Sequence, residues 1–194
     1  MKIPGLINIL IVAVTLMVTV VACDSGRSRD AVPRRTAYPR VSLCDTIYSA
    51  TMAGDVTLWV NNGAQLSAVE NSGDSNSRWY DIEYPTYGAV VHLTVMRPAD
   101  IATAMENRLQ RIELNAGDSP ATVTELSGKG VEGILVSTPQ AMVTPLQLLA
   151  TVRSHTVVSG AVEFTDTLYR GDAEARRPVV EALRIDLTRL IEGL

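Results

Sequence analysis

Hydrophobic and polar positions divide the sequence into three regions. Residues 3–22 form an apolar run that follows the single charge of Lys2. Residues 24–40 have no hydrophobic periodicity and contain two prolines, five arginines and two aspartates, a composition typical of an unfolded segment. From residue 41 onward, apolar and polar residues alternate, which indicates β-strands. We therefore predict a removed leader over 1–22, a flexible tether over 23–40 and one folded domain over 41–194.

The alternation predicts antiparallel strands joined by turns. Residues 56–60 alternate and end at the Asn-Asn-Gly sequence of 61–63, which is a turn signal. In the clearest hairpin, residues 80–84 are joined to residues 89–95 across a turn at 85–88. Further strands are predicted at 121–126, 134–136, 145–152 and 158–164, and loops at 71–77, 115–120 and 170–172.

Two segments have helical spacing. Asp100 is the predicted N-cap of the first, which carries apolar residues at Ile101, Met105, Leu109 and Ile112. The second is predicted from about Pro178, a residue that suits the first turn of a helix. Its apolar stripe consists of Val180, Leu183, Leu187, Leu190, Ile191 and Leu194. Such stripes must pack on a partner, so we predict an α+β fold in which an antiparallel sheet of about six strands is packed by two helices.

The apolar run ends in Val20-Val21-Ala22-Cys23, which resembles the lipobox of bacterial lipoproteins. In that class, the cysteine thiol is joined to a diacylglycerol, the chain is cut before the cysteine, and the new amine is acylated. The alternatives are an ordinary cleaved signal and a transmembrane helix, since about 18 or more apolar residues can span a bilayer. The resemblance implies that Cys23 is the lipidation site and that the protein reaches a membrane through this anchor.

The charge and cysteine content of the chain limit the kinds of partner that it can bind. The chain has 194 residues and a net charge of −4, and loss of Lys2 with residues 1–22 leaves 172 residues near −5. This balance argues against nucleic-acid binding, which needs a basic face. A domain of this size can be stable without disulfides, and lipidation of Cys23 leaves Cys44 as a single thiol. The tether arginines could contact anionic headgroups or an acidic partner, but a solvated linker is the favoured interpretation.

Residues 128–133 match the pattern G-x-G-x-x-G by letter. A phosphate-binding loop of this kind follows a strand and opens a helix, so that backbone amides and the helix dipole meet the phosphates. Here the strand-like sequence of residues 134–136 follows. We interpret the glycines as part of a turn or bulge, and we predict no cofactor.

The candidate catalytic residues are sparse. His92 lies inside a predicted strand and His155 in a predicted turn, and neither is accompanied by a nucleophile motif or by metal-ligand spacing. The acidic pair Asp81 and Glu83 points outward from one strand face. We therefore predict no catalytic residues, no metal site and a protein that is not an enzyme. A periplasmic enzyme that uses His92 or His155 is the alternative.

Four of the nine aromatic residues lie between Trp79 and Tyr87. On one strand face such a cluster belongs more often to the core than to a binding platform. The alternative is a partner or ligand surface formed by Tyr84 and Tyr87.

Several motifs occur in an order that is similar to a known family. They are residues 79–85 (Trp-Tyr-Asp-Ile-Glu-Tyr-Pro), 88–94 (Gly-Ala-Val-Val-His-Leu-Thr), 133–135, 144–147, 154–156 and 160–164, followed by a helix with Val180, Asp186, Leu190 and Glu192. Together with the lipobox, they resemble the gliding-motility lipoprotein D family of Bacteroidetes. The resemblance covers about residues 37–194 and is poor over 41–76, where this chain is shorter.

The resemblance implies a non-catalytic accessory role in gliding motility and type IX protein secretion. It further implies an outer-membrane lipoprotein facing the periplasm, with proteins of that machinery as partners. Only the role of Cys23 carries over residue by residue. The order of elements is also similar to the Mog1/PsbP-like fold, which says nothing about function. The alternative function is a lipid-anchored periplasmic module that binds a small ligand or a cell-wall component through Tyr84 and Tyr87.

Overall fold

The computed structural model describes residues 41, 46–70, 75–128, 130–141 and 143–192. The segment Arg40–Leu194 forms one compact unit. The predicted leader, the lipidation site Cys23, the tether and Cys44 lie outside the described residues. In the part of the chain that is described, no helix combines the length and the hydrophobicity needed to cross a bilayer.

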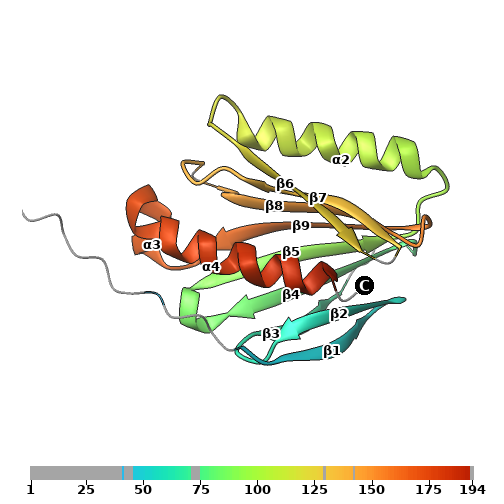
Figure 1. Cartoon of the computed structure of the whole chain (residues 1–194), viewed down its shortest axis with the longest axis horizontal. Coiled ribbons are helices and arrows are strands. Elements are labelled where there is room, and N and C mark those ends of the chain that lie inside the picture. The colour runs from blue at the N-terminus through green and yellow to red at the C-terminus, as the bar shows by residue number, and fades with distance from the viewer. Residues whose placement is uncertain (1–40, 42–45, 71–74, 129, 142, 193–194) are drawn as a thin grey trace, which may run out of the picture. The chain divides into compact units, whose positions relative to one another are not determined.

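Two antiparallel sheets and three α-helices make up the described fold (Figure 1). In spatial order, the larger sheet consists of β3 (Gln65–Val69), β4 (Ser77–Tyr84), β5 (Ala89–Met96), β9 (Thr156–Phe164), β8 (Leu146–Val152), β7 (Val131–Ser137) and β6 (Thr122–Gly128). The smaller sheet is the hairpin of β1 (Tyr48–Ala53) and β2 (Val56–Asn61). The helices are α2 (Ile101–Ala116), α3 (Thr167–Gly171) and α4 (Ala173–Glu192), and a 3-10 turn, η2 (Pro85–Tyr87), joins β4 to β5.

The predicted fold class is confirmed: the protein is α+β, with a large antiparallel sheet packed against helices. The large sheet has seven strands instead of about six, and the β1–β2 hairpin forms a second sheet that is not paired with it. Neither β1 nor β3 was predicted as an individual strand. Most residues of both strands are exposed or only half-buried, so they lack the apolar alternation that marks the other strands.

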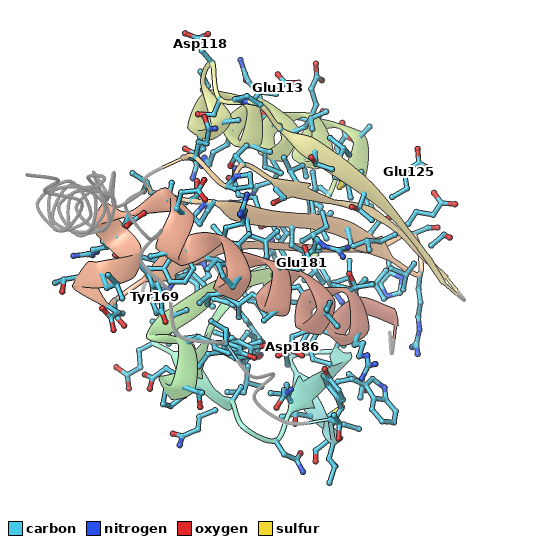
Figure 2. The ribbon with its side chains drawn as sticks, turned by 60° about the vertical axis from the view of Figure 1, so that its left-hand side comes forward. Glu113, Asp118, Glu125, Tyr169, Glu181 and Asp186 are labelled. Atoms are coloured by element: carbon cyan, nitrogen blue, oxygen red, sulfur yellow. The ribbon has the colours of Figure 1, made fainter. Side chains whose placement is uncertain are left out.

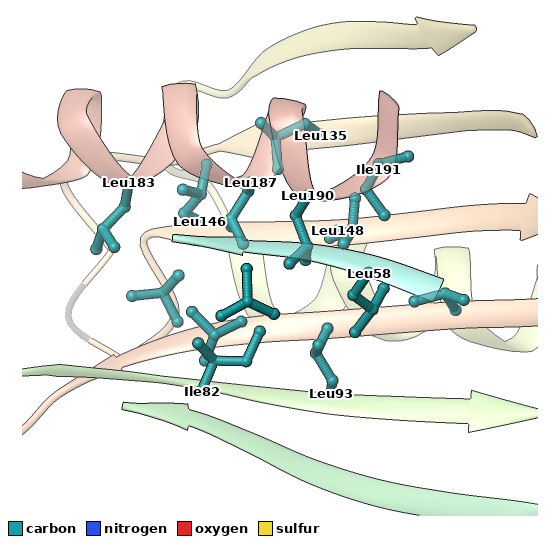
Figure 3. Close-up of a cluster of buried hydrophobic side chains, with 14 of the residues drawn as sticks. Leu58, Ile82, Leu93, Leu135, Leu146, Leu148, Leu183, Leu187, Leu190 and Ile191 are labelled. Carbon is teal, nitrogen blue, oxygen red and sulfur yellow. The ribbon is translucent and has the colours of Figure 1, made fainter. Parts of the chain in front are cut away.

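One face of the large sheet carries the main core, covered by α4 and β2 (Figure 3). Alternate residues of the central strands point to this face, as the two-residue period of a strand requires. The buried side chains labelled in the figure are Leu58, Ile82, Leu93, Leu135, Leu146, Leu148, Leu183, Leu187, Leu190 and Ile191. The apolar stripe predicted for the last helix is therefore confirmed for its described members.

The opposite face of the sheet is only partly covered. Helix α2 packs over β8 and β9, and a smaller core of Met96, Ile112, Val136, Leu149 and Val157 lies beneath it. Strands β3 and β4 and much of β5 show exposed or half-buried side chains on this face. We call this region the open sheet face and define it by Val69, Trp79, Asp81, Glu83 and His92.

Helix α2 begins as predicted. The Oδ1 atom of Asp100 accepts a hydrogen bond from the Thr103 amide at 3.3 Å, which is an N-cap. The predicted apolar face is only partly right, because Leu109 is 40% exposed whereas Ile112 is buried. The helix is rotated so that Ala104 joins the buried side in place of Leu109.

Two predictions near the last helix are wrong. Residues 167–171 form the short helix α3, although 170–172 was predicted as a loop. Helix α4 begins at Ala173, five residues before the predicted start, and Pro178 lies inside it. The Asp172 carboxylate caps α4, because its Oδ1 accepts hydrogen bonds from the amides of Glu174 at 2.9 Å and Ala175 at 3.1 Å.

The glycine-rich segment 128–133 contains the turn that the sequence indicates. Strands β6 and β7 pair as a hairpin across it, and Gly130 adopts a φ of +83°, which favours glycine. Gly133 lies within β7, where a Cβ atom would be 2.5 Å from the carbonyl oxygen of Leu149. The interpretation as a turn is therefore confirmed at Gly130, and the structure adds the close backbone approach at Gly133. Strand β7 follows where a phosphate-binding loop needs a helix.

Candidate functional site

Tyr84 and Tyr87 do not form a surface. Each is 1% exposed, and their rings stack with centroids 5.9 Å apart. Tyr84 alternates with Tyr80 and Ile82 on the α4 side of β4, and the 3-10 turn η2 ends in the buried Tyr87. The partner surface predicted at these two residues is therefore wrong, and the preferred interpretation as core is confirmed.

The open sheet face carries a row of charged side chains. Asp81 and His92 are direct partners in the β4–β5 register, and Asp81 Oδ1 lies 2.7 Å from His92 Nδ1. His92 Nε2 lies 3.4 Å from Glu163 Oε2 on β9. Arg170 on α3 donates a hydrogen bond to Glu163 Oε1 at 2.6 Å and holds the pKa of Glu163 below its usual value, with burial opposing and His92 assisting. Four elements from two regions that are distant in sequence, the β4–β5 hairpin and the β9–α3 segment, thus contribute to one row.

This row does not have the arrangement of a nucleophilic catalyst. A general base needs a hydroxyl or thiol in reach of one ring nitrogen, with an orienting group on the other. In the described segments, both ring nitrogens of His92 face carboxylates. His155 lies in the turn before β9, where its Nδ1 is 2.8 Å from the Arg153 carbonyl oxygen. Among the residues that are described, no group of three or more His, Cys, Asp and Glu side chains could hold a metal ion.

A cleft of about 200 Å³ lies between α2 and strands β5, β8 and β9, next to the open sheet face. Its polar lining comes from Arg108, Arg111 and Asn115 of α2 and from Thr94, Gln147 and Ser159 of the sheet, with His92 at its margin. Asn115 donates a hydrogen bond to Gln147 Oε1 at 2.9 Å, and Gln147 donates one to the Ile112 carbonyl oxygen at 3.4 Å. The side-chain amides of Asn115 and Gln147 are therefore hydrogen-bonded to each other and to the backbone of α2.

Arg108 and Arg111 are the cationic groups of this cleft, which we call the α2 cleft. Within the described ranges, neither guanidinium forms an ion pair with a carboxylate, and Nη2 of Arg108 lies 4.0 Å from the sulfur of Met96. Burial, and secondarily the charge of Arg111, lower the pKa of Arg108. Sequence analysis missed this pair, although Arg108 follows Ile101 and Met105 at helical spacing and precedes Ile112, so it interrupts the apolar stripe.

A second polar cluster joins α4 to the β1–β2 hairpin. Asp186, which Figure 2 labels on α4, is 1% exposed. It accepts hydrogen bonds from the Tyr48 hydroxyl and from Asn61 Nδ2, the latter at 3.2 and 3.3 Å. The Arg189 guanidinium lies 5.1 Å from the centre of the Tyr48 ring. Burial raises the pKa of Asp186, and the two hydrogen bonds and Arg189 oppose the shift.

The turn end of the same hairpin is also held by a carboxylate. Asp55 accepts hydrogen bonds from Arg97, which follows β5, and from the Thr156 hydroxyl at 3.0 Å. Burial acts to raise the pKa of Asp55, but the hydrogen bonds from Arg97 and Thr156 outweigh it, so the pKa lies below its usual value. Both ends of the hairpin are thus attached to the main body.

Comparison with known proteins adds no further identification. No protein-family model matches the sequence, and no curated protein matches it.

Proposed function

We propose that this chain is a non-catalytic, lipid-anchored lipoprotein that supports gliding motility or type IX secretion by binding a protein of that machinery. The anchor is Cys23, and the location is the outer membrane, facing the periplasm. Three features support the proposal: the lipobox, the resemblance to the gliding-motility lipoprotein D family, and the exposed side of the hairpin in which much of that resemblance lies.

The observation that carries the proposal is the exposure of the open sheet face. Motif residues 79–84 lie on β4 and motif residues 89–94 lie on β5, and these two strands pair residue for residue. One side of this hairpin builds the core, whereas the other displays Trp79, which is 46% exposed, next to its exposed cross-strand neighbour Val69. Exposed aromatic and aliphatic side chains beside charged ones are typical of protein interfaces.

The geometry also favours binding over catalysis. The charged row of Asp81, His92 and Glu163 lacks a nucleophile in the described part of the chain, and Arg170 already pairs with Glu163. Burial of Tyr84 and Tyr87 removes the site predicted for the alternative ligand-binding function. That alternative is therefore not proposed at those residues.

The first test concerns the anchor and the pathway. Deletion of the gene is expected to abolish release of type IX cargo into the medium and to leave precursor in the periplasm. The wild-type gene should restore release, whereas Cys23→Ala should be mislocalised and should not complement. Cys44→Ala, which removes the other cysteine, is the matched control and should complement fully. Unchanged cargo release in the deletion strain, or full complementation by Cys23→Ala, would contradict the proposal.

The second test concerns the open sheet face. Trp79→Ser is expected to change the free energy of unfolding by at most about 1 kcal/mol, because the side chain is nearly half exposed. It should weaken partner binding by roughly 30-fold if Trp79 is an interface anchor worth about 2 kcal/mol. Trp59→Ser is the matched control, since Trp59 is 42% exposed but lies on β2. Site-specific crosslinking of both variants in cells measures the difference, and equal partner yields would exclude this face.

A further inference from the structure

We propose that the α2 cleft is a binding site for a phosphate group, which Arg108 and Arg111 hold between the helix and the sheet. This inference goes beyond the accessory role above and does not depend on it. The site is new with respect to the aromatic cluster, because Tyr84 and Tyr87 lie in the core on the α4 side of the sheet.

The charge arrangement of α2 is the first argument. Arg108 and Arg111 are three residues apart on one helix, a spacing at which like charges repel. No carboxylate in the described segments forms an ion pair with either guanidinium. Arg108 is half-buried beside Met96 in the row of positions that otherwise contacts the smaller core. Mutual repulsion acts against both guanidiniums and burial acts against Arg108, and an anion that binds both groups would offset these costs.

The lining of the cleft is the second argument. Thr94 and Ser159, which are direct partners in the β5–β9 register, both line the cleft. Hydroxyl groups can donate hydrogen bonds to an oxyanion from the side opposite the arginines. The acids of the neighbouring row are engaged elsewhere, since Glu163 pairs with Arg170 and Asp81 lies 2.7 Å from His92, and in the described segments neither forms an ion pair with Arg108 or Arg111.

The choice of ligand follows from charge and size. Two guanidiniums match the two negative charges of a phosphate monoester better than the single charge of a carboxylate, and the planar guanidinium fork suits phosphate oxygens. The cleft of about 200 Å³ lies below the roughly 300–1,000 Å³ that encloses a whole drug-sized ligand. We therefore infer that it takes one phosphate group, either from a soluble phosphate compound or from a phospholipid headgroup.

The experiment is a titration of the full chain in detergent with inorganic phosphate, compared with sodium chloride at equal ionic strength. Thermal unfolding is followed by tryptophan fluorescence. Phosphate should raise the midpoint saturably in wild type and in the control Arg177→Gln, which removes one exposed arginine from α4. Arg108→Gln and Arg111→Gln should each raise the phosphate concentration needed for half of this rise at least tenfold. Arg108→Lys, which keeps the charge but loses the planar guanidinium, should need a concentration between those of wild type and Arg108→Gln.

A second arm distinguishes the two sources of phosphate. The full chain is reconstituted in vesicles of phosphatidylcholine alone or with phosphatidic acid. If a headgroup occupies the cleft, phosphatidic acid should raise the unfolding midpoint of wild type, and added phosphate should then raise it no further. The midpoint of Arg108→Gln should not change with phosphatidic acid. If a soluble compound is the ligand, phosphatidic acid should leave the phosphate response intact. The proposal would be overturned if phosphate did not raise the unfolding midpoint of wild type. It would also be overturned if phosphate raised the midpoint equally in wild type and in both glutamine variants.

Discussion

Replacement of Arg176 by methionine is expected to lower the free energy of unfolding by about 3–5 kcal/mol. Arg176 is 1% exposed, and its guanidinium donates hydrogen bonds to the carbonyl oxygens of Pro139 at 3.0 Å, Tyr169 at 3.0 Å and Arg170 at 3.4 Å. It thereby joins the β7–β8 loop to α3 and α4. Methionine fills much of the same space with apolar atoms but donates no hydrogen bond, so these carbonyl groups would lose their charged donor.

The neighbouring residue supplies the control for this prediction. Arg177 is exposed and forms a surface ion pair with Glu174 at 3.4 Å, so Arg177→Met should cost at most about 1 kcal/mol. Urea unfolding of both variants, monitored by circular dichroism, gives the comparison. A loss for Arg176→Met of about the same size as for Arg177→Met would show that the three carbonyl groups find other donors.

Removal of the Asp186 carboxyl group should have the next largest effect on stability. Asp186→Ala would leave the Tyr48 hydroxyl and Asn61 Nδ2 without the acceptor that now joins them, and it would create a small cavity. An orphaned buried polar group costs about 1–3 kcal/mol, so we expect a loss of about 2–4 kcal/mol. Asp186→Asn, which has the same shape and retains an acceptor oxygen, should lose less.

The pH dependence separates the charge of Asp186 from its hydrogen bonds. Burial raises the pKa of Asp186 in the folded protein above the value near 4 of an unfolded carboxyl group. The stabilisation linked to this shift is therefore fully present below about pH 4 and is lost as the pH rises through the folded-state pKa. Asparagine does not titrate, so Asp186→Asn should gain stability relative to wild type over that rise.

The measurement is urea unfolding of wild type and Asp186→Asn across that pH range. Asp55 and Glu181, whose pKa values are lowered, change stability in the opposite direction, but they are present in both proteins and cancel in the difference. A constant difference at every pH would mean that Asp186 does not titrate as its burial requires.

Local sequence signals predicted the elements whose side chains alternate or repeat clearly. The alternation of β4 and β5 agrees with their buried faces, and Asp100 marks the start of α2, whereas β8 and the first half of β9 are buried on both faces. These signals work because the period of a strand or helix decides which neighbours share a face, whatever the partner is. They failed at β1 and β3, where few residues are buried, and at Pro178, where the carboxylate of Asp172 sets the start of α4 instead.

The sequence by itself therefore determined the fold class, most strands and the apolar stripe of α4. Only the tertiary structure decided that Tyr84 and Tyr87 are buried, that Arg108 and Arg111 line a cleft, and that Asp186 bonds to Tyr48, 138 residues away. The physical reason is that periodicity describes a residue relative to its neighbours in the chain. Burial, pairing of charges and shifts in pKa depend on which distant elements pack against that residue.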